Sequence, residues 1–229
     1  MTVFYHLTRC AIINAKICKR GFDMTKNDFS KIQTPNVREI LPEAVDAIFD
    51  TISQKDIELK AVENMAAEFL CSHRENTDLE TVIQKIRLLD YINTTNLRMY
   101  RDDITITALA EIILAQPAFD KWLQNGDIRA VELIARGNNT INLFSFATKY
   151  CCYHNYYVYH RDDFSIYDTV VKDTIPKYIN VTKTYIEDLR KNYQYREFLD
   201  LIDRLMTAYN INCESRRKKL DLFLWYYNR

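Results

Sequence analysis

The sequence predicts an all-α fold, a two-lobed helical bundle, from three observations. Three glycines and four prolines in 229 residues supply too few turn residues for a sandwich or a barrel. Apolar residues recur at three- and four-residue steps over long stretches, as they do along the buried face of a helix. Hydrophobic residues make up 48% of the chain, which argues against a disordered protein and allows a sizeable core.

Prolines and capping residues divide the first half of the chain into helices. Pro42 can open a helix, because proline fits the first helical turn. Residues 77–80 form a capping pattern for another helix, and the polar run 93–96 interrupts the periodicity after it. The polar residues 25–34 favour a loop. The helices expected here span residues 7–18, 42–49, 55–70, 77–91, 104–115 and 117–123.

The second half begins with a sharp stop and restart at Asn125-Gly126-Asp127. Pro176 should kink or end the helix that contains it, because proline cannot donate a helical hydrogen bond. We expect residues 1–229 to form a single helical domain, and the alternative is two packed lobes with a seam near residues 93–103. The helices expected here span residues 128–136, 143–154, 168–179, 195–209 and 215–227.

Charge and cysteine content limit the function classes. The chain has 31 acidic and 31 basic residues, which argues against strong nonspecific nucleic-acid binding, although a basic face can coexist with an acidic one. The six cysteines include no CxxC pair, so we expect reduced thiols and no zinc site. No apolar run is long enough to span a membrane, and no signal peptide is apparent. We therefore expect a cytoplasmic protein with no membrane contact, no metal ion and no cofactor.

The residues with the clearest chemical potential are Lys149 and Asp168, which lie 19 positions apart. Lys149 stands in an apolar helical run, where loss of solvent can drive an amine toward its neutral, nucleophilic form. Asp168 opens the next helix, where free backbone N–H groups favour an ionised carboxylate. Two simpler interpretations stay open. The Lys149 stem can cover aromatic surface while its amine reaches water, and Asp168 can be a plain helix cap.

Residues 127–154 and the Lys149–Asp168 spacing resemble the helix-hairpin-helix DNA glycosylases, most closely the 8-oxoguanine glycosylases. The resemblance implies that Lys149 attacks C1′ of a damaged nucleoside after base flipping, and that the resulting imine permits strand scission. It implies that Asp168 stabilises positive charge on the sugar. The family's hairpin turn is usually rich in glycine, whereas here Gly137 is followed by two asparagines, which tolerate left-handed backbone.

Further site residues follow from the same resemblance. A pocket for the extruded base would be lined by Phe144, Phe146, Tyr150 and His154, for which core packing is the alternative. Two groups would contact the DNA backbone: the hairpin residues Asn138, Asn139 and Thr140, and the basic residues Arg216 and Arg217.

The sequence therefore predicts a base-excision glycosylase and abasic lyase that acts on an oxidised purine in double-stranded DNA. The alternative is a catalytically silent helical domain that binds DNA or another protein, favoured by the single hairpin glycine, the tyrosine content and the balanced charge. The sequence makes no prediction of the oligomeric state.

Overall fold

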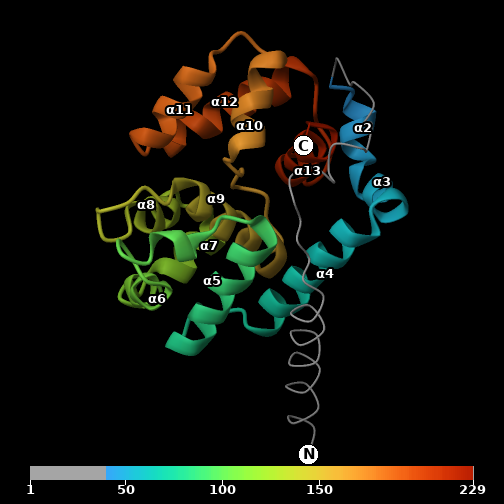
Figure 1. The fold of residues 1–229 in the computed structure, drawn as a ribbon. Coiled ribbons are helices and arrows are strands. Elements are labelled where there is room, and N and C mark those ends of the chain that lie inside the picture. Colours follow the sequence, from blue (N-terminus) through green and yellow to red (C-terminus); the bar gives the residue numbers. More distant parts are fainter. Residues whose placement is uncertain (1–39, 229) are drawn as a thin grey trace, which may run out of the picture. The chain divides into compact units, whose positions relative to one another are not determined.

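The computed structural model describes residues 40–228, and within this range the regular structure is helical and contains no strand. The predicted all-α class is confirmed (Figure 1). All described residues belong to one compact unit, Val37–Arg229, and the 93–103 segment lies inside it. The helix predicted over 7–18 and the loop predicted over 25–34 lie outside the described residues. No helix within residues 40–228 has the length and apolar character that crossing a membrane requires.

Twelve α-helices are present among the described residues, together with two 3-10 turns and one π-helical turn. The α-helices are α2 Pro42–Asp46, α3 Ile48–Lys55, α4 Ile57–Ser72, α5 Leu79–Asn93, α6 Ile106–Leu114, α7 Phe119–Asn125, α8 Arg129–Arg136, α9 Phe144–Tyr153, α10 Thr169–Thr174, α11 Lys183–Lys191, α12 Tyr195–Ala208 and α13 Arg216–Asn228. The 3-10 turns are η2 Leu97–Tyr100 and η4 Ile175–Lys177, and the π-helical turn is η3 His154–Val158.

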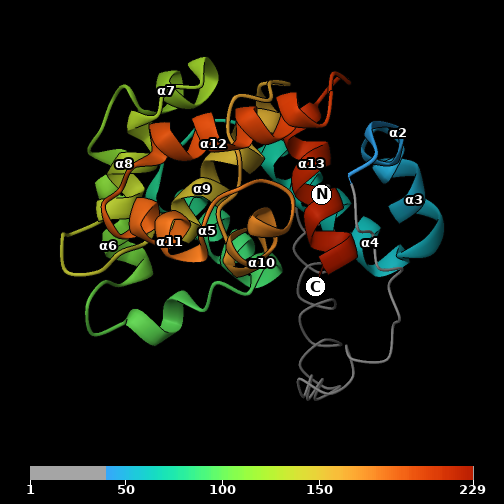
Figure 2. The same cartoon turned by 90° about the horizontal axis from the view of Figure 1, so that it is seen from above.

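Helix α9 is the core of this unit, because every one of its residues except Ser145 is buried. A helix that is buried on all sides must have other elements on each face. Helices α5 and α8 pack against it (Figure 2), and η3, which continues it, packs against α4. The chain therefore places Lys149 in the centre of the unit rather than on a surface helix.

The helices predicted over 128–136 and 143–154 are present as α8 and α9, joined by the connection 137–143. The Leu143 amide donates to the Ala135 carbonyl at 2.9 Å and closes the connection. Gly137 and Asn139 have positive φ angles of 49° and 65°, so an asparagine adopts the left-handed backbone that its position in the sequence predicted. Pro176 also behaves as predicted: α10 ends at Thr174 and the proline lies in the 3-10 turn η4.

Three local predictions were wrong. Helix α11 was missed: it has only two buried residues, Ile186 and Leu189, among charged ones, although Thr182 caps it by accepting from the Tyr185 amide at 3.1 Å. The helix predicted over 143–154 does not end at His154, because residues 154–158 continue α9 as a π-helical turn. The helix predicted over 42–49 is divided into α2 and α3, with a break at Ala47.

We predict that Gly126→Ala lowers the free energy of unfolding by about 1–3 kcal/mol. Gly126 ends α7 with φ +68°, and a Cβ atom there would meet the Asp163 side chain. That side chain cannot easily move, because it accepts from Asn155 Nδ2 at 2.9 Å and from Arg161 Nε at 2.6 Å. Urea unfolding of Gly126→Ala and of the exposed control Asn125→Ala measures the effect. Equal costs for the two variants would contradict the prediction.

Candidate active site around Lys149

A connecting segment, residues 159–168, fixes the position of Asp168 relative to Lys149. Tyr195 holds the backbone of Ser165 through its hydroxyl, which accepts from the Ser165 amide and donates to its carbonyl, both at 2.9 Å. The Tyr167 amide donates to Thr148 Oγ1 at 3.0 Å. Because Thr148 precedes Lys149 and Tyr167 precedes Asp168, this bond brings the chain segments of the two predicted catalytic residues close together.

The Lys149 side chain is buried, with 6% of its surface exposed. Its Nζ donates to the Asn93 carbonyl, at the end of α5, over a long 3.4 Å. Burial lowers the pKa of the Lys149 amine, and charge interactions with Asp168, Asp221 and Asp90 offset this only in part. The site therefore favours the neutral amine more than water does.

The three carboxylates around Lys149 have different partners. Asp168 caps α10 and accepts from the Val171 amide at 2.8 Å. Asp90 accepts from the Thr95 hydroxyl at 2.5 Å and from the Leu97 amide at 2.9 Å. Among residues 40–228, no group donates a hydrogen bond to Asp221 or forms an ion pair with it. Two of the three carboxylates are thus held by backbone amides.

The third of these carboxylates belongs to Asp221. Its carboxyl is half-buried on α13. Burial raises its pKa to about 7; Asp168 and Glu63 raise it further, while Lys218 and Lys149 lower it. The residue also lines a cavity of about 10 Å³, with room for a single water molecule, together with residues of α10, α12, α13 and the connecting segment.

A second buried lysine, Lys218, forms an ion pair with Glu63. Its Nζ lies 2.9 Å from Glu63 Oε2 and 4.3 Å from the centre of the Tyr153 ring. The hydroxyls of Tyr153 and Tyr157 both donate to the Glu63 carboxylate. Burial alone would lower the pKa of Lys218, but Glu63 and the two tyrosines raise it well above its usual value. Lys218 is therefore a structural cation that ties α13 to α4.

A third buried amine, Lys85, is satisfied by neutral acceptors. Its Nζ donates to the carbonyls of Arg74 and Glu75 and to Asn76 Oδ1, at 3.3, 2.9 and 3.1 Å. Burial lowers its pKa to about 8, against charge interactions with acidic neighbours, of which Asp120 is the strongest. Asn76 Oδ1 also accepts from the Tyr150 hydroxyl at 2.7 Å.

The four residues predicted to line a base pocket are all buried in the core. Phe144 packs edge-on against Tyr167, and Phe146 lies 6.0 Å from the Tyr150 ring. His154 stacks on Tyr150 at 4.2 Å and contacts its carbonyl oxygen through Nδ1 at 2.9 Å. Each of the four is at most 2% exposed: Phe144, Phe146, Tyr150 and His154. In this conformation they are packing residues.

Some of the residues predicted to contact the DNA backbone are bonded to other parts of the chain, and others are exposed. Asn138 Nδ2 and the Thr140 hydroxyl both donate to the Asp103 carbonyl, and so brace the hairpin against the segment after η2. Asn139 and Arg216 are exposed. The Arg217 guanidinium is bonded to Asp203 at 2.5 Å and to Ser165 Oγ at 3.2 Å. The connection 137–143 and Arg216 therefore offer the accessible part of this set.

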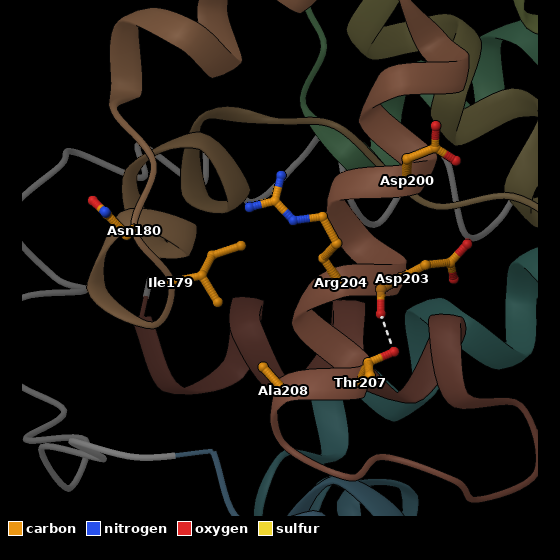
Figure 3. Close-up of a pocket in the computed structure, with 7 residues that line it drawn as sticks. All are labelled: Ile179, Asn180, Asp200, Asp203, Arg204, Thr207 and Ala208. Atoms are coloured by element: carbon orange, nitrogen blue, oxygen red, sulfur yellow. Dashed lines mark hydrogen bonds between the residues drawn. The ribbon is translucent and has the colours of Figure 1, made fainter.

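A surface groove lies elsewhere on the described part of the chain. It is an open groove between α12 and residues 179–180, across which Arg204 and Ile179 face each other (Figure 3). Neither this groove nor the small cavity at Asp221 is lined by Lys149 or Asp168. Within the described residues no cluster of three His, Cys, Asp or Glu side chains is arranged to hold a metal ion.

Sequence reasoning missed three residues of this site. Asp221 and Asp90 were passed over because they lie on helices far from Lys149 in sequence. Lys218 was not among the predicted site residues. Spacing was the available signal for both α13 residues. Lys218, Asp221 and the buried Leu222 are three and four positions apart, so they lie on the same face of the helix.

Comparisons with known proteins match part of this chain. The family model HI_0787_N, described as an N-terminal domain, matches residues 42–161. That region contains Lys149 and Glu63 and ends before Asp168 and Lys218. An uncharacterized protein of Haemophilus influenzae is 31% identical over 156 residues, which cover 66% of this chain and 68% of the relative. No solved structure matches the chain.

We predict that Lys218→Met lowers the free energy of unfolding by about 3–5 kcal/mol, because it leaves the Glu63 carboxylate buried without its cation. Lys219→Met is the matched control: its amine is next along α13 but pairs with Asp46, whose side chain is 59% exposed. That change should cost about 0–1 kcal/mol. Urea unfolding near neutral pH measures the free energy of unfolding of both variants. Equal losses would show that the buried Lys218–Glu63 pair stabilises the protein no more than the exposed pair does.

Proposed function

The chain belongs to the HI_0787_N family, and we propose that it is a lysine-dependent DNA glycosylase and abasic lyase acting on an oxidised purine. The observation that carries this proposal is the placement of Lys149. Its amine is buried, its only hydrogen bond in the described region is long, and burial lowers its pKa. The Asp168 carboxylate beside it lies at a helix start, as the glycosylase resemblance implies.

In the proposed reaction, Lys149 Nζ forms a bond to C1′ of the flipped nucleoside. The C1′–N9 bond breaks and its electron pair leaves with the base. Positive charge develops on the sugar, where the Asp168 carboxylate stabilises it. Opening of the C1′–O4′ bond then gives an imine, which permits strand scission by elimination.

The tight packing around Lys149 sets a requirement on this reaction. A nucleobase needs space that neither described cavity supplies next to the amine. DNA binding must therefore open the side of the site where the connecting segment is bonded to α9. The connection 137–143 would meet the DNA backbone, since Asn139 and its exposed neighbours lie at the N-terminus of α9, where backbone amides favour an anion.

A catalytically silent DNA-binding or protein-interaction domain is the alternative. Burial of the four predicted pocket residues and the engagement of Arg217 by Asp203 favour it. Salt-sensitive binding to duplex DNA without base release or a covalent adduct would support the silent DNA-binding form. Absence of DNA binding at low salt would point to the protein-interaction form.

We predict that borohydride traps a covalent complex between the protein and a duplex that contains 8-oxoguanine, because hydride reduces the imine to a stable amine. Lys149→Gln should reduce trapping by on the order of 10³-fold or more, since the nucleophile is lost. Lys172→Gln, on α10, is the control and should trap normally, because Lys172 interacts with Glu187 at 3.8 Å instead of facing Lys149. Gel analysis of the cross-linked complex measures the yield. No adduct with the unmodified protein defeats the proposal.

We predict that Asp168→Asn lowers the trapping rate by about 10²–10³-fold with little change in stability. Asparagine caps a helix as well as aspartate does, so the variant removes the charge and keeps the cap. Asp78→Asn is the matched control, because Asp78 caps α5 by accepting from the Thr81 amide at 2.8 Å. Thermal melting confirms the fold of both variants. If both trap at the normal rate, Asp168 is a cap and nothing more.

A further inference from the structure

We propose that the turn between α11 and α12 contacts DNA backbone phosphates together with the connection between α8 and α9. The two-turn surface, as we call it, consists of residues 136–143 and 190–194. This inference rests on the proposed function for the identity of the ligand, duplex DNA. It does not follow from the glycosylase resemblance, which ends near residue 180 and does not reach the α11–α12 turn.

The two turns are in direct contact. Asn142 Nδ2 donates to the Arg190 carbonyl at 2.9 Å, across 48 positions of sequence. The guanidinium carbon of Arg136 lies 4.5 Å from the centre of the Tyr193 ring, within the range of a cation–π interaction. The two segments therefore form one continuous surface.

The two-turn surface is basic although the whole chain has no net charge. Its residues include no Asp or Glu and three cations: Arg136, Arg190 and Lys191. It also contains four asparagines and one glutamine, and side-chain amides donate to phosphate oxygens in protein–DNA complexes. In a protein of balanced charge, binding of a polyanion depends on a local basic face of this kind.

Two of the three cations are available to a ligand, because Arg136 and Lys191 are exposed. Among residues 40–228, Arg136 has no ion pair and no hydrogen bond from its guanidinium, so its N–H groups can donate to a phosphate. Lys191 lies 3.9 Å from Asp188, and the two side chains are 58% and 51% exposed, so this pair is weak. Arg190 is bonded to Glu187 at 2.6 Å and supports the turn.

The backbone of both turns is fixed before any ligand binds. Asn139 and Tyr193 have φ angles of 65° and 57°, a conformation that a bulky residue such as tyrosine rarely adopts. The Asn139 amide donates to the Arg136 carbonyl at 2.7 Å, and the Gln194 amide donates to the Leu189 carbonyl at 2.8 Å. Preformed turns lower the entropy cost of ordering the surface on binding.

A simpler role for these cations is to stabilise helix ends. Arg136 lies in the last turn of α8, and Arg190 and Lys191 lie in the last turn of α11, where a cation interacts favourably with the helix dipole. Lys55 supplies the same kind of charge in the last turn of α3 and is exposed, but it lies outside the two-turn surface. Lys55 is therefore the matched control.

The test measures binding of a fluorescently labelled, undamaged DNA duplex by fluorescence anisotropy, at salt concentrations between about 50 and 200 mM. Arg136→Gln and Lys191→Gln should each weaken binding by about 5–10-fold at roughly 100 mM salt. Each should also lower the slope of log affinity against log salt concentration by roughly 0.9, because one phosphate contact is lost. Lys55→Gln should bind as the unmodified protein does.

Two further variants separate charge from shape. Arg136→Lys restores the charge, so it should recover most of the affinity that Arg136→Gln loses. Asn139→Asp keeps a residue that tolerates left-handed backbone and adds a negative charge, so it should weaken binding. Thermal melting of each variant establishes that the protein is folded.

Binding and catalysis are measured separately, so the two proposals can fail separately. If the unmodified protein binds the duplex while Arg136→Gln and Lys191→Gln keep its affinity and its salt slope, the two-turn surface is overturned and the proposed function is not. If these variants lose affinity as expected but borohydride traps no adduct with the unmodified protein, the surface is supported and the glycosylase activity fails.

Two other outcomes overturn the choice of ligand. Absence of duplex binding by the unmodified protein at low salt overturns both the surface and the proposed function. Tighter binding to single-stranded RNA of the same sequence, lost in Arg136→Gln and Lys191→Gln, would assign the two-turn surface to RNA and overturn its role in DNA binding.

Discussion

The burial of α9 on every side is the constraint on which the rest of the structure depends. An isolated ammonium in a protein interior costs several kcal/mol unless other groups compensate. Three lysines are buried around this helix, and they are compensated differently. Lys218 is paired with Glu63 at 2.9 Å, and Lys85 donates to three neutral oxygens. Lys149 has one long bond and a set of nearby carboxylates. The contacts of Lys218 and Lys85 stabilise a buried cation. The contacts of Lys149 stabilise its charged form less well, because its pKa is lowered.

The connecting segment 159–168 couples this amine to the remainder of the fold. Asp162 caps α13 by accepting from the amides of Arg217 and Lys218, at 2.7 and 2.9 Å. The same segment then bonds to Tyr195 on α12 and to Thr148 on α9 before it reaches Asp168. A shift of α12 or α13 would therefore move Asp168 relative to Lys149. Under the proposed function, this coupling supplies a physical route by which DNA binding opens the site.

The site also crosses the boundary of the family match. Residues 42–161 supply Lys149, Asp90 and Glu63. Residues beyond that range supply the opposing charges, Asp168, Lys218 and Asp221. The buried Glu63 carboxylate would lose its cation without α13. In this chain, the matched region and the C-terminal helices therefore share one electrostatic core.

The sequence by itself determined the helical class, most helix positions and the Asp168 cap of α10, because these depend on local spacing, capping and backbone preference. It missed α11, whose inward face consists of two residues among charged neighbours, and it did not separate Lys218 from its basic neighbours Arg216, Arg217 and Lys219. Only the tertiary structure decided that Lys218 is buried against Glu63 and that Arg217 is bonded to Asp203. It also decided that the four aromatic and histidine candidates pack in the core. Burial and charge pairing depend on which helices meet in space, and residues more than 60 positions apart, such as Glu63 and Lys218, carry no local signal of that meeting.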